Sequence, residues 1–170
     1  MKHLALIALV ALAACKEELA EAPAAVTMTE DALSHFCQMH IAEHPGPKGQ
    51  VHLAGMTDPI FFAQVRDLMA YLKSPERDAK ILAVYVSDMG AESWHAVSPD
   101  NWIAAPEAVF VINAGVAGGM GAPEIVPFAT TAEAEKFTAT YGGTVVAYDA
   151  IPDDVAIGPV DLNTALVDPA

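Results

Sequence analysis

The chain has 170 residues, of which 54% are hydrophobic, so it is long enough to bury the core of one domain or of two small lobes. Acidic residues outnumber basic ones by 22 to 8, which gives a formal net charge of −14. A surface this acidic repels phosphate groups. The composition therefore argues against nucleic-acid binding and against direct attachment of the protein to an anionic membrane surface.

The first fifteen residues have the organisation of an export signal. Lys2 and His3 provide a short positive start, and an apolar stretch over residues 4–14 follows. This stretch is shorter than the about 20 residues that a membrane-spanning helix needs. It ends in the sequence Leu-Ala-Ala-Cys, which resembles a bacterial lipobox whose cysteine is Cys15.

The lipobox resemblance implies that residues 1–14 are a lipoprotein signal peptide and that Cys15 becomes a diacylated N-terminus. Two acyl chains anchor a protein firmly, whereas one anchors it weakly. Lys16 stands where an inner-membrane retention signal has aspartate, which favours the outer membrane. Residues 15–27, rich in glutamate and alanine, are expected to form a lipidated flexible tether. The alternative is an ordinary signal peptide that is cleaved nearby without lipid attachment.

The body of the chain begins with the signals of one mixed unit of strands and a helix. Residues 51–53 predict a short strand, and Gly55 is a turn signal after it. Over residues 62–72 the apolar side chains recur at helical spacing, which predicts an amphipathic helix that ends before Pro75. The apolar, β-branched run over residues 81–86 predicts a buried strand.

The same order of elements recurs in the second half of the chain. Thr130 and Glu133 form a capping box that predicts the start of a helix, and a pair of glycines after Tyr141 predicts its end. The elements expected are a strand at 108–112, a tight glycine-rich loop at 115–121, a short strand at 124–128, the helix and a last strand at 144–148.

The predicted architecture is therefore α+β, with two ββαβ-type lobes that share an interface. Residues 28–100 are assigned to the first lobe and residues 101–150 to the second. Residues 151–170, which contain several prolines, are predicted to form an irregular C-terminal tail. Each lobe is too small to be stable alone, so we expect the two lobes to share a core or interface.

Cys37 is the only cysteine left if Cys15 carries lipid, so it cannot form an intramolecular disulfide. An unpaired thiol in an exported, oxidising compartment is either buried and inert or used for chemistry. Met39 follows two residues later, and on an extended segment both side chains point to the same side. A thiolate and a thioether that converge in this way select Cu(I) over hard cations.

Histidine ligands and zinc are alternatives at this motif. His35, His40 and His44 are each able to supply a nitrogen ligand, although a hydrogen-bonded or solvated side chain is the more ordinary role. Zinc favours additional cysteine and histidine ligands at tetrahedral spacing such as CxxC, which the sequence lacks. Cys-x-Met alone is a weak signal because it occurs by chance in many chains.

Met120 lies between glycines, in the sequence Gly-Gly-Met-Gly over residues 118–121. A loop of this kind exposes the methionine, so Met120 is a candidate third soft ligand; alternatively, it packs as a lid on the lobe interface. Signals for catalysis are weaker. The sequence has no GxSxG elbow, its glycines are not followed by GK[ST], and acidic pairs are expected in a chain with 22 acids.

Several spaced motifs resemble, in order, the NosL family of nitrous oxide reductase accessory proteins. They lie within residues 27–160, at residues 36–39, 43–48, 86–90, 101–103, 118–128, 142–143 and 151–152. The resemblance implies two ββαβ-type lobes, related to the organomercurial lyase fold. It also implies that Cys37, Met39 and Met120 bind Cu(I).

In function, the resemblance implies a periplasm-facing lipoprotein that binds Cu(I) and delivers it for assembly of the copper centres of nitrous oxide reductase. Such a chain is a metallochaperone and not an enzyme, with the reductase as copper acceptor and a membrane transporter of the same maturation system as a further candidate partner. Two alternatives stay open: a lyase-like enzyme acting on a thiophilic, organometallic substrate, and a copper-free assembly factor that holds the reductase.

Overall fold

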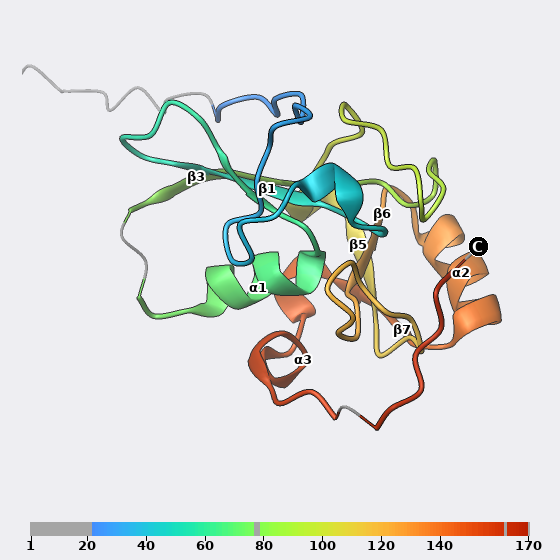
Figure 1. Ribbon diagram of the computed structural model, residues 1–170. Coiled ribbons are helices and arrows are strands. Elements are labelled where there is room, and N and C mark those ends of the chain that lie inside the picture. Colours follow the sequence, from blue (N-terminus) through green and yellow to red (C-terminus); the bar gives the residue numbers. More distant parts are fainter. Residues whose placement is uncertain (1–21, 77–78, 162, 170) are drawn as a thin grey trace, which may run out of the picture.

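The computed structural model describes residues 22–76, 79–161 and 163–169. They form two antiparallel sheets, one of four strands and one of three, with helices packed against them (Figure 1). The predicted signal peptide and Cys15 lie outside the described residues. Within the described part of the chain, no helix has both the length and the apolar character that crossing a membrane requires.

The first sheet is built around β1, which is paired on both sides. Its strand order is β2-β1-β3-β4, and Val51 of β1 lies opposite Ile60 on one side and Val84 on the other. Although β4 falls in the segment predicted for the second lobe, it pairs with β3 of the first sheet. The elements are β1 (Gly49–Leu53), β2 (Ile60–Phe62), α1 (Val65–Lys73), β3 (Ile81–Val86) and β4 (Ile103–Ala104).

The second sheet repeats the arrangement of the first three strands. Its order is β6-β5-β7, so the first strand of the unit is again the central one, with β6 and β7 antiparallel on either side. The predicted duplication of a ββαβ unit and the α+β class are therefore confirmed. The elements are β5 (Val109–Ile112), β6 (Val126–Phe128), α2 (Thr131–Tyr141) and β7 (Thr144–Ala147).

Side chains from both lobes share one hydrophobic cluster, and a second cluster of buried residues packs around α2. Phe62 and Leu68 of the first lobe and Phe110 and Ile125 of the second are fully buried in the same cluster. Separating the lobes would expose this apolar surface to water, which is unfavourable in proportion to its area. The two lobes are therefore one packed unit, as their small size predicts.

Helix α1 begins at Val65, three residues later than its periodicity predicts. Phe62 fits the helical spacing but ends β2, where it lies opposite Gly49 of β1. Both a strand end and a helix start would direct this ring toward the core, so the apolar pattern alone does not separate them. From Val65 onward the spacing holds, and Leu68 and Met69 are buried.

Helix α2 has the ends that its sequence predicts. The Oγ1 atom of Thr130 accepts a hydrogen bond from the N–H of Glu133 at 3.3 Å, which satisfies one of the free N–H groups of the first turn. The helix ends at Tyr141, and Gly142 follows with a φ of 73°, a conformation that glycine adopts at little cost.

The N-terminal part of the described chain is held on the first sheet. The side-chain amide of Gln50 donates to the carbonyl of Val26 and accepts from its N–H, both at 3.0 Å. The hydroxyl of Tyr85 donates to the carbonyl of Pro23 at 2.7 Å. Residues 23–26 are therefore fixed by hydrogen bonds, in contrast to the flexible tether expected over residues 15–27.

A short helix, α3 (Asp153–Ile157), lies in the segment predicted to be irregular, so that prediction does not hold there. Asp153 and Asp154 in its first turn complement the positive end of the helix. Ala156 is buried in the shared core. This long-range contact stabilises the helix, and the prolines of the segment, from which an irregular tail is predicted, do not reveal it. Among the described residues, the remaining elements are three short 3-10 helices, η1 (Ile41–Glu43), η2 (Ala105–Glu107) and η3 (Tyr148–Ala150).

Candidate metal centre

Cys37 and Met39 lie in a tight turn over residues 33–40, so the prediction of an extended segment is wrong. The N–H of Ser34 donates to the carbonyl of Met39, and the N–H of Gln38 donates to the carbonyl of Ser34, each at 2.9 Å. Gln38 has a φ of 58°, which reverses the chain between the two candidate ligands. Its side-chain amide donates to the carbonyls of Ser34 and His35, which stabilises the turn.

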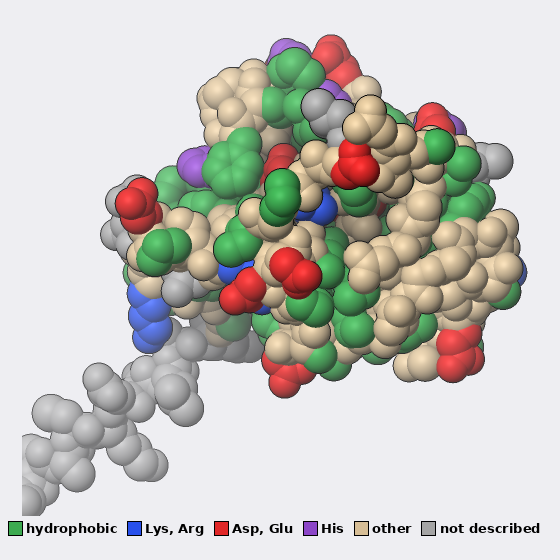
Figure 2. Space-filling view, turned by 90° about the horizontal axis from the view of Figure 1, so that it is seen from below, with side chains coloured by type: hydrophobic (Ala, Val, Ile, Leu, Met, Phe, Trp, Pro, Cys, Tyr) green, Lys and Arg blue, Asp and Glu red, His purple; other side chains and the backbone are tan. Residues whose placement is uncertain are grey.

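The candidate sulfur ligands are accessible from solvent. Met39 is 44% exposed, Met120 is 40% exposed, and Cys37 is half-buried and unpaired. Figure 2 shows one face of the molecule, on which hydrophobic side chains are exposed between acidic ones. Sulfur atoms at such positions are able to take up a soft ion and to release it, because a second protein can approach them.

The loop over residues 118–121 lies directly against the first lobe. A Cβ atom on Gly119 would lie 2.8 Å from the Cβ of His44, 2.8 Å from the carbonyl oxygen of Pro45 and 2.9 Å from that of Ala63. Real Cβ atoms do not approach other atoms this closely, so the position requires glycine. Gly119 is therefore needed for close approach, whereas Gly121 on the other side of Met120 has free space around it and a φ of 78°, a conformation that favours glycine.

A hydrogen bond to the first lobe fixes the backbone of Met120 while its side chain stays exposed. The N–H of Met120 donates to Oε1 of Gln64 at 3.1 Å. The Nε2 atom of Gln64 in turn donates to Asp67 at 2.9 Å, which orients the amide. Within the same loop, Gly118 lies against the carboxylate of Glu124, where a Cβ atom would clash.

Both loops attach to one short segment, residues 61–64, which consists of the end of β2 and the link from β2 to α1. The N–H of His35 donates to the carbonyl of Phe61 at 2.7 Å, and the N–H of Ala63 donates to Oγ of Ser34 at 3.2 Å. Gln64, the next residue, holds Met120. The structure thus places the turn that carries Cys37 and the loop that carries Met120 beside the same segment, next to α1 in Figure 1.

The three candidate histidines have different surroundings. His44 Nδ1 is 2.9 Å from the carbonyl oxygen of Gly119, and its buried Nε2 has no hydrogen-bond partner among the described residues. His35 packs its ring on Tyr71 at 5.4 Å between centroids, and His40 Nδ1 is 3.2 Å from the carbonyl of Glu30. In the described part of the chain, no three histidine, cysteine or acidic side chains gather into a metal-binding group.

Lys48 is a buried cation that the sequence analysis does not single out. It is 2% exposed, and its Nζ donates to the carbonyls of His44 at 2.6 Å, Pro45 at 3.1 Å and Gly46 at 2.7 Å. Burial lowers the pKa of Lys48 to about 8, against the opposing effect of the Glu124 carboxylate. A single lysine amid glycine and proline, directly before a buried strand, is the one signal in the sequence that points to it.

Glu124 is the second buried ionisable group at this junction that sequence reasoning missed. Its Oε1 accepts hydrogen bonds from the backbone N–H groups of Arg66 and Ile125, both at 2.9 Å. Its Oε2 is buried without a partner among the described residues. Burial raises the pKa of Glu124 to about 8, although these hydrogen bonds and the charge of Lys48 act in the opposite direction.

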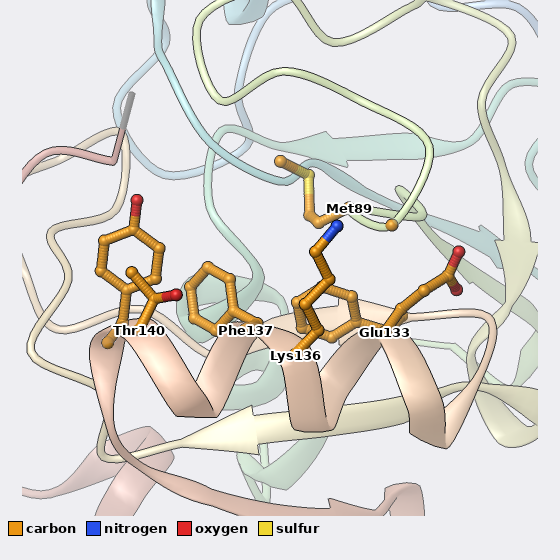
Figure 3. Close-up of a pocket in the computed structure, with 8 residues that line it drawn as sticks. Met89, Glu133, Lys136, Phe137 and Thr140 are labelled. Atoms are coloured by element: carbon orange, nitrogen blue, oxygen red, sulfur yellow. The ribbon is translucent and has the colours of Figure 1, made fainter.

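A separate pocket of about 290 Å³ opens beside α2 (Figure 3). In this view Met89 faces the side chains of Lys136 and Phe137 on the helix. None of the predicted ligand residues lines this pocket, so it is not part of the candidate metal centre. Its lining residues are Met89, Gly90, Phe128, Glu133, Lys136, Phe137, Thr140 and Tyr141.

The sequence is similar to those of known proteins over both lobes. A sequence model of the NosL family matches residues 25–156. A copper-binding lipoprotein NosL of Achromobacter cycloclastes is 46% identical over 159 residues, which cover 92% of this chain and 82% of that protein. A copper-binding lipoprotein NosL of Stutzerimonas stutzeri is 29% identical over 137 residues, which cover 80% of this chain and 70% of that protein.

Solved structures share the fold. The crystal structure of the copper chaperone NosL from Shewanella denitrificans matches with a TM-score of 0.72 at 32% identity, covering 76% of this chain and 96% of that one. The solution structure of apo-NosL from Achromobacter cycloclastes matches with a TM-score of 0.50 at 43% identity, covering 71% of this chain and 97% of that one. Because the sequence model, the curated relatives and the solved structures agree, the chain belongs to the NosL family.

Proposed function

We propose that this protein is a periplasm-facing, lipid-anchored metallochaperone that binds Cu(I) through Cys37, Met39 and Met120. The observation that carries the proposal is the accessibility of these soft ligands on two loops that attach to the same segment, residues 61–64. Thiolate and thioether sulfur select Cu(I) over hard cations. A site with few, accessible ligands lets the ion pass to a partner through an intermediate in which both proteins share it.

The names of the relatives support this proposal. The two curated relatives are copper-binding lipoproteins, and the protein from Shewanella denitrificans is a copper chaperone. These names describe binding proteins, in agreement with the prediction that the chain is not an enzyme. The word lipoprotein also agrees with a lipobox that ends at Cys15.

The proposal extends to the protein that receives the copper. We infer that the acceptor is nitrous oxide reductase, whose copper centres are assembled with the delivered Cu(I), and that a membrane transporter of the same maturation system is a further partner. Both inferences derive from the resemblance of the spaced motifs. Anchoring in the outer membrane derives from Lys16, which follows the lipidated cysteine.

Competition for Cu(I) with a chromophoric chelator, without oxygen, tests the binding site. Cys37→Ala should lose most of the affinity, because Cys37 supplies the anionic ligand, and the wild-type affinity should fall as the pH is lowered because thiolate binding releases a proton. Met56→Ala is the control, since this methionine is also exposed, at 51%, but lies in the turn after β1. Equal Cu(I) affinity of the wild type and Cys37→Ala refutes the site.

Mixing the Cu(I)-loaded protein with copper-free nitrous oxide reductase tests delivery. Transfer of copper to the reductase, measured in each protein after separation, is the expected result. Retention of the copper by the loaded protein contradicts delivery to this acceptor but leaves the binding result standing.

A further inference from the structure

The loop that carries Met120 lies on a set of buried and half-buried side-chain and backbone groups, here called the platform, which consists of His44, Pro45, Ala63, Gln64 and Glu124. The backbone of Gly119 approaches the first three of these residues so closely that no side chain fits between them. Any movement of the platform therefore moves the loop, and with it the sulfur of Met120.

Lys48 contacts the same carbonyl groups. Its Nζ is 3.1 Å from the carbonyl oxygen of Pro45 and 3.5 Å from that of Ala63, the two oxygens that face Gly119. It also donates to the carbonyl of His44 at 2.6 Å. An ammonium group has three N–H donors and no acceptor, so it matches a cluster of carbonyl oxygens.

The ammonium group of Lys48 stabilises an arrangement that the backbone would not keep alone. Carbonyl oxygens that point toward one another repel, and a buried carbonyl without a donor costs free energy. The N–H of Lys48 also donates to Oγ of Ser87 at 3.1 Å, and the N–H of Ser87 donates to the carbonyl of Lys48 at 3.0 Å, which fixes the residue at the end of β3. The lysine thus connects the first sheet to the platform.

We propose that Lys48 is a positioning residue for copper binding: its ammonium group holds the carbonyl groups on which Gly119 lies, and so determines where Met120 presents its sulfur to the turn over residues 33–40. The inference rests on the proposed function and adds to it a residue that does not touch the metal. It also explains why a lysine is fully buried at this place, with its Nζ directed at backbone carbonyl groups.

Lys48→Met tests the proposal, since it keeps the length of the side chain and removes the ammonium group. In the copper-free protein, amide hydrogen exchange of residues 118–121 should become about tenfold faster. The Cu(I) affinity should fall about 10- to 100-fold, as is usual when a group that orients a metal ligand is lost. X-ray absorption of the loaded variant should show one sulfur neighbour fewer than the wild type, with the Cys37 thiolate still bound.

Lys73→Met is the matched control. Lys73 also bonds a carbonyl, that of Ile151 at 2.8 Å, and an acidic side chain, Asp153 at 2.6 Å, but it lies at the end of α1 and contacts α3. This variant should leave the loop exchange and the Cu(I) affinity as in the wild type. If Lys48→Met folds and its loop exchanges at the wild-type rate in the copper-free protein, the proposal is wrong.

Gly119→Ala keeps the proposal testable if Lys48→Met does not fold. It disturbs the same contact from the side of the loop, because the added Cβ meets His44, Pro45 and Ala63. We expect faster exchange of residues 118–121 and loss of the Met120 sulfur from the copper site. Gly115→Ala is its control, since the nearest atom to a Cβ there is 4.0 Å away. Wild-type behaviour of Gly119→Ala overturns the proposal.

Different results would refute Cu(I) binding by the protein and the role of Lys48. Absence of Cu(I) binding in the wild type refutes the proposed function. Unchanged exchange of the loop in copper-free Lys48→Met, or in Gly119→Ala where the lysine variant is unfolded, refutes the role of Lys48, because this measurement needs no metal.

Discussion

Replacing Glu124 by glutamine should change how the stability of the protein depends on pH. The carboxyl group is buried under Gly118, with two backbone N–H groups donating to one oxygen and none to the other. Burial is the largest cause of its raised pKa of about 8; the nearby charge of Asp67 also raises the pKa, and that of Lys48 lowers it. Glu124→Gln keeps the shape of the side chain and removes its titration.

The sign of the effect follows from the two pKa values. In the unfolded chain the carboxyl group has its ordinary pKa of 4.5, whereas in the folded protein it has a pKa of about 8. Between these values the folded state binds more protons, so the stability contributed by this group is present below pH 4.5 and is lost as the pH rises toward 8. One pKa unit corresponds to about 1.36 kcal/mol, so the free energy of unfolding should fall by about 5 kcal/mol in all. This is a large part of the about 5–15 kcal/mol by which a domain is stable.

Lys48 acts in a different pH range. Its folded pKa of about 8 lies below the ordinary 10.5, so the unfolded chain binds more protons between these values. Stability from this group therefore rises with pH above about 8 and does not cancel the effect of Glu124 below it.

Urea unfolding of the wild type and of Glu124→Gln, at several values from about pH 5 to about pH 8, measures the effect. The free energy of unfolding of the wild type should fall over this range. At low pH the variant should be less stable than the wild type by about 1–3 kcal/mol, because its buried amide N–H group has no acceptor. This difference should shrink or reverse as the pH rises. Glu135→Gln, an exposed position on α2, should follow the wild type. Parallel curves for the wild type and Glu124→Gln would refute the reasoning.

Three further predictions concern the metal ligands, the anchor and the core. Met120→Ala should weaken Cu(I) binding and abolish the protection of residues 118–121 that copper produces in hydrogen exchange. Met39→Ala should also weaken binding but keep that protection. Equal exchange of the wild-type loop with and without copper means that Met120 is not a ligand. Cys15→Ser should release the protein from the membrane fraction, and unchanged membrane recovery refutes lipidation. Phe110→Ala should lower the free energy of unfolding by about 3–5 kcal/mol in a single transition, because this ring is buried in the core that both lobes share; two separate transitions would show that the lobes unfold independently.

Local patterns in the sequence were sufficient for most of the elements. β3 spans Ile81–Val86, the apolar run that predicts it, and Thr130 and Gly142 mark the two ends of α2. These signals act within a few residues: β-branched side chains favour strands, a threonine oxygen caps the first turn, and glycine adopts positive φ. The order of the elements, read twice along the chain, then predicts two ββαβ units that must share a core because each is small.

The residue types of the candidate site were also recognisable in the sequence, because the preference of Cu(I) for sulfur is a property of the side chains themselves. Cys37, Met39 and Met120 remain predicted ligands on this basis. Their arrangement was not recognisable. Gln38 reverses the chain between the first two through hydrogen bonds to Ser34 and His35, where strand alternation predicts a straight segment.

Only the tertiary structure decided which polar groups position the Met120 loop. The carbonyl groups that Lys48 holds belong to the turn before β1 and to the segment before α1, and the loop that lies on them comes from the other lobe. In the same way, Phe62 belongs to β2 because it pairs with β1, and α3 forms where Ala156 reaches the shared core. Contacts between segments far apart in the chain determine these features, and neither periodicity nor capping signals encode such contacts, because both describe only neighbours in sequence.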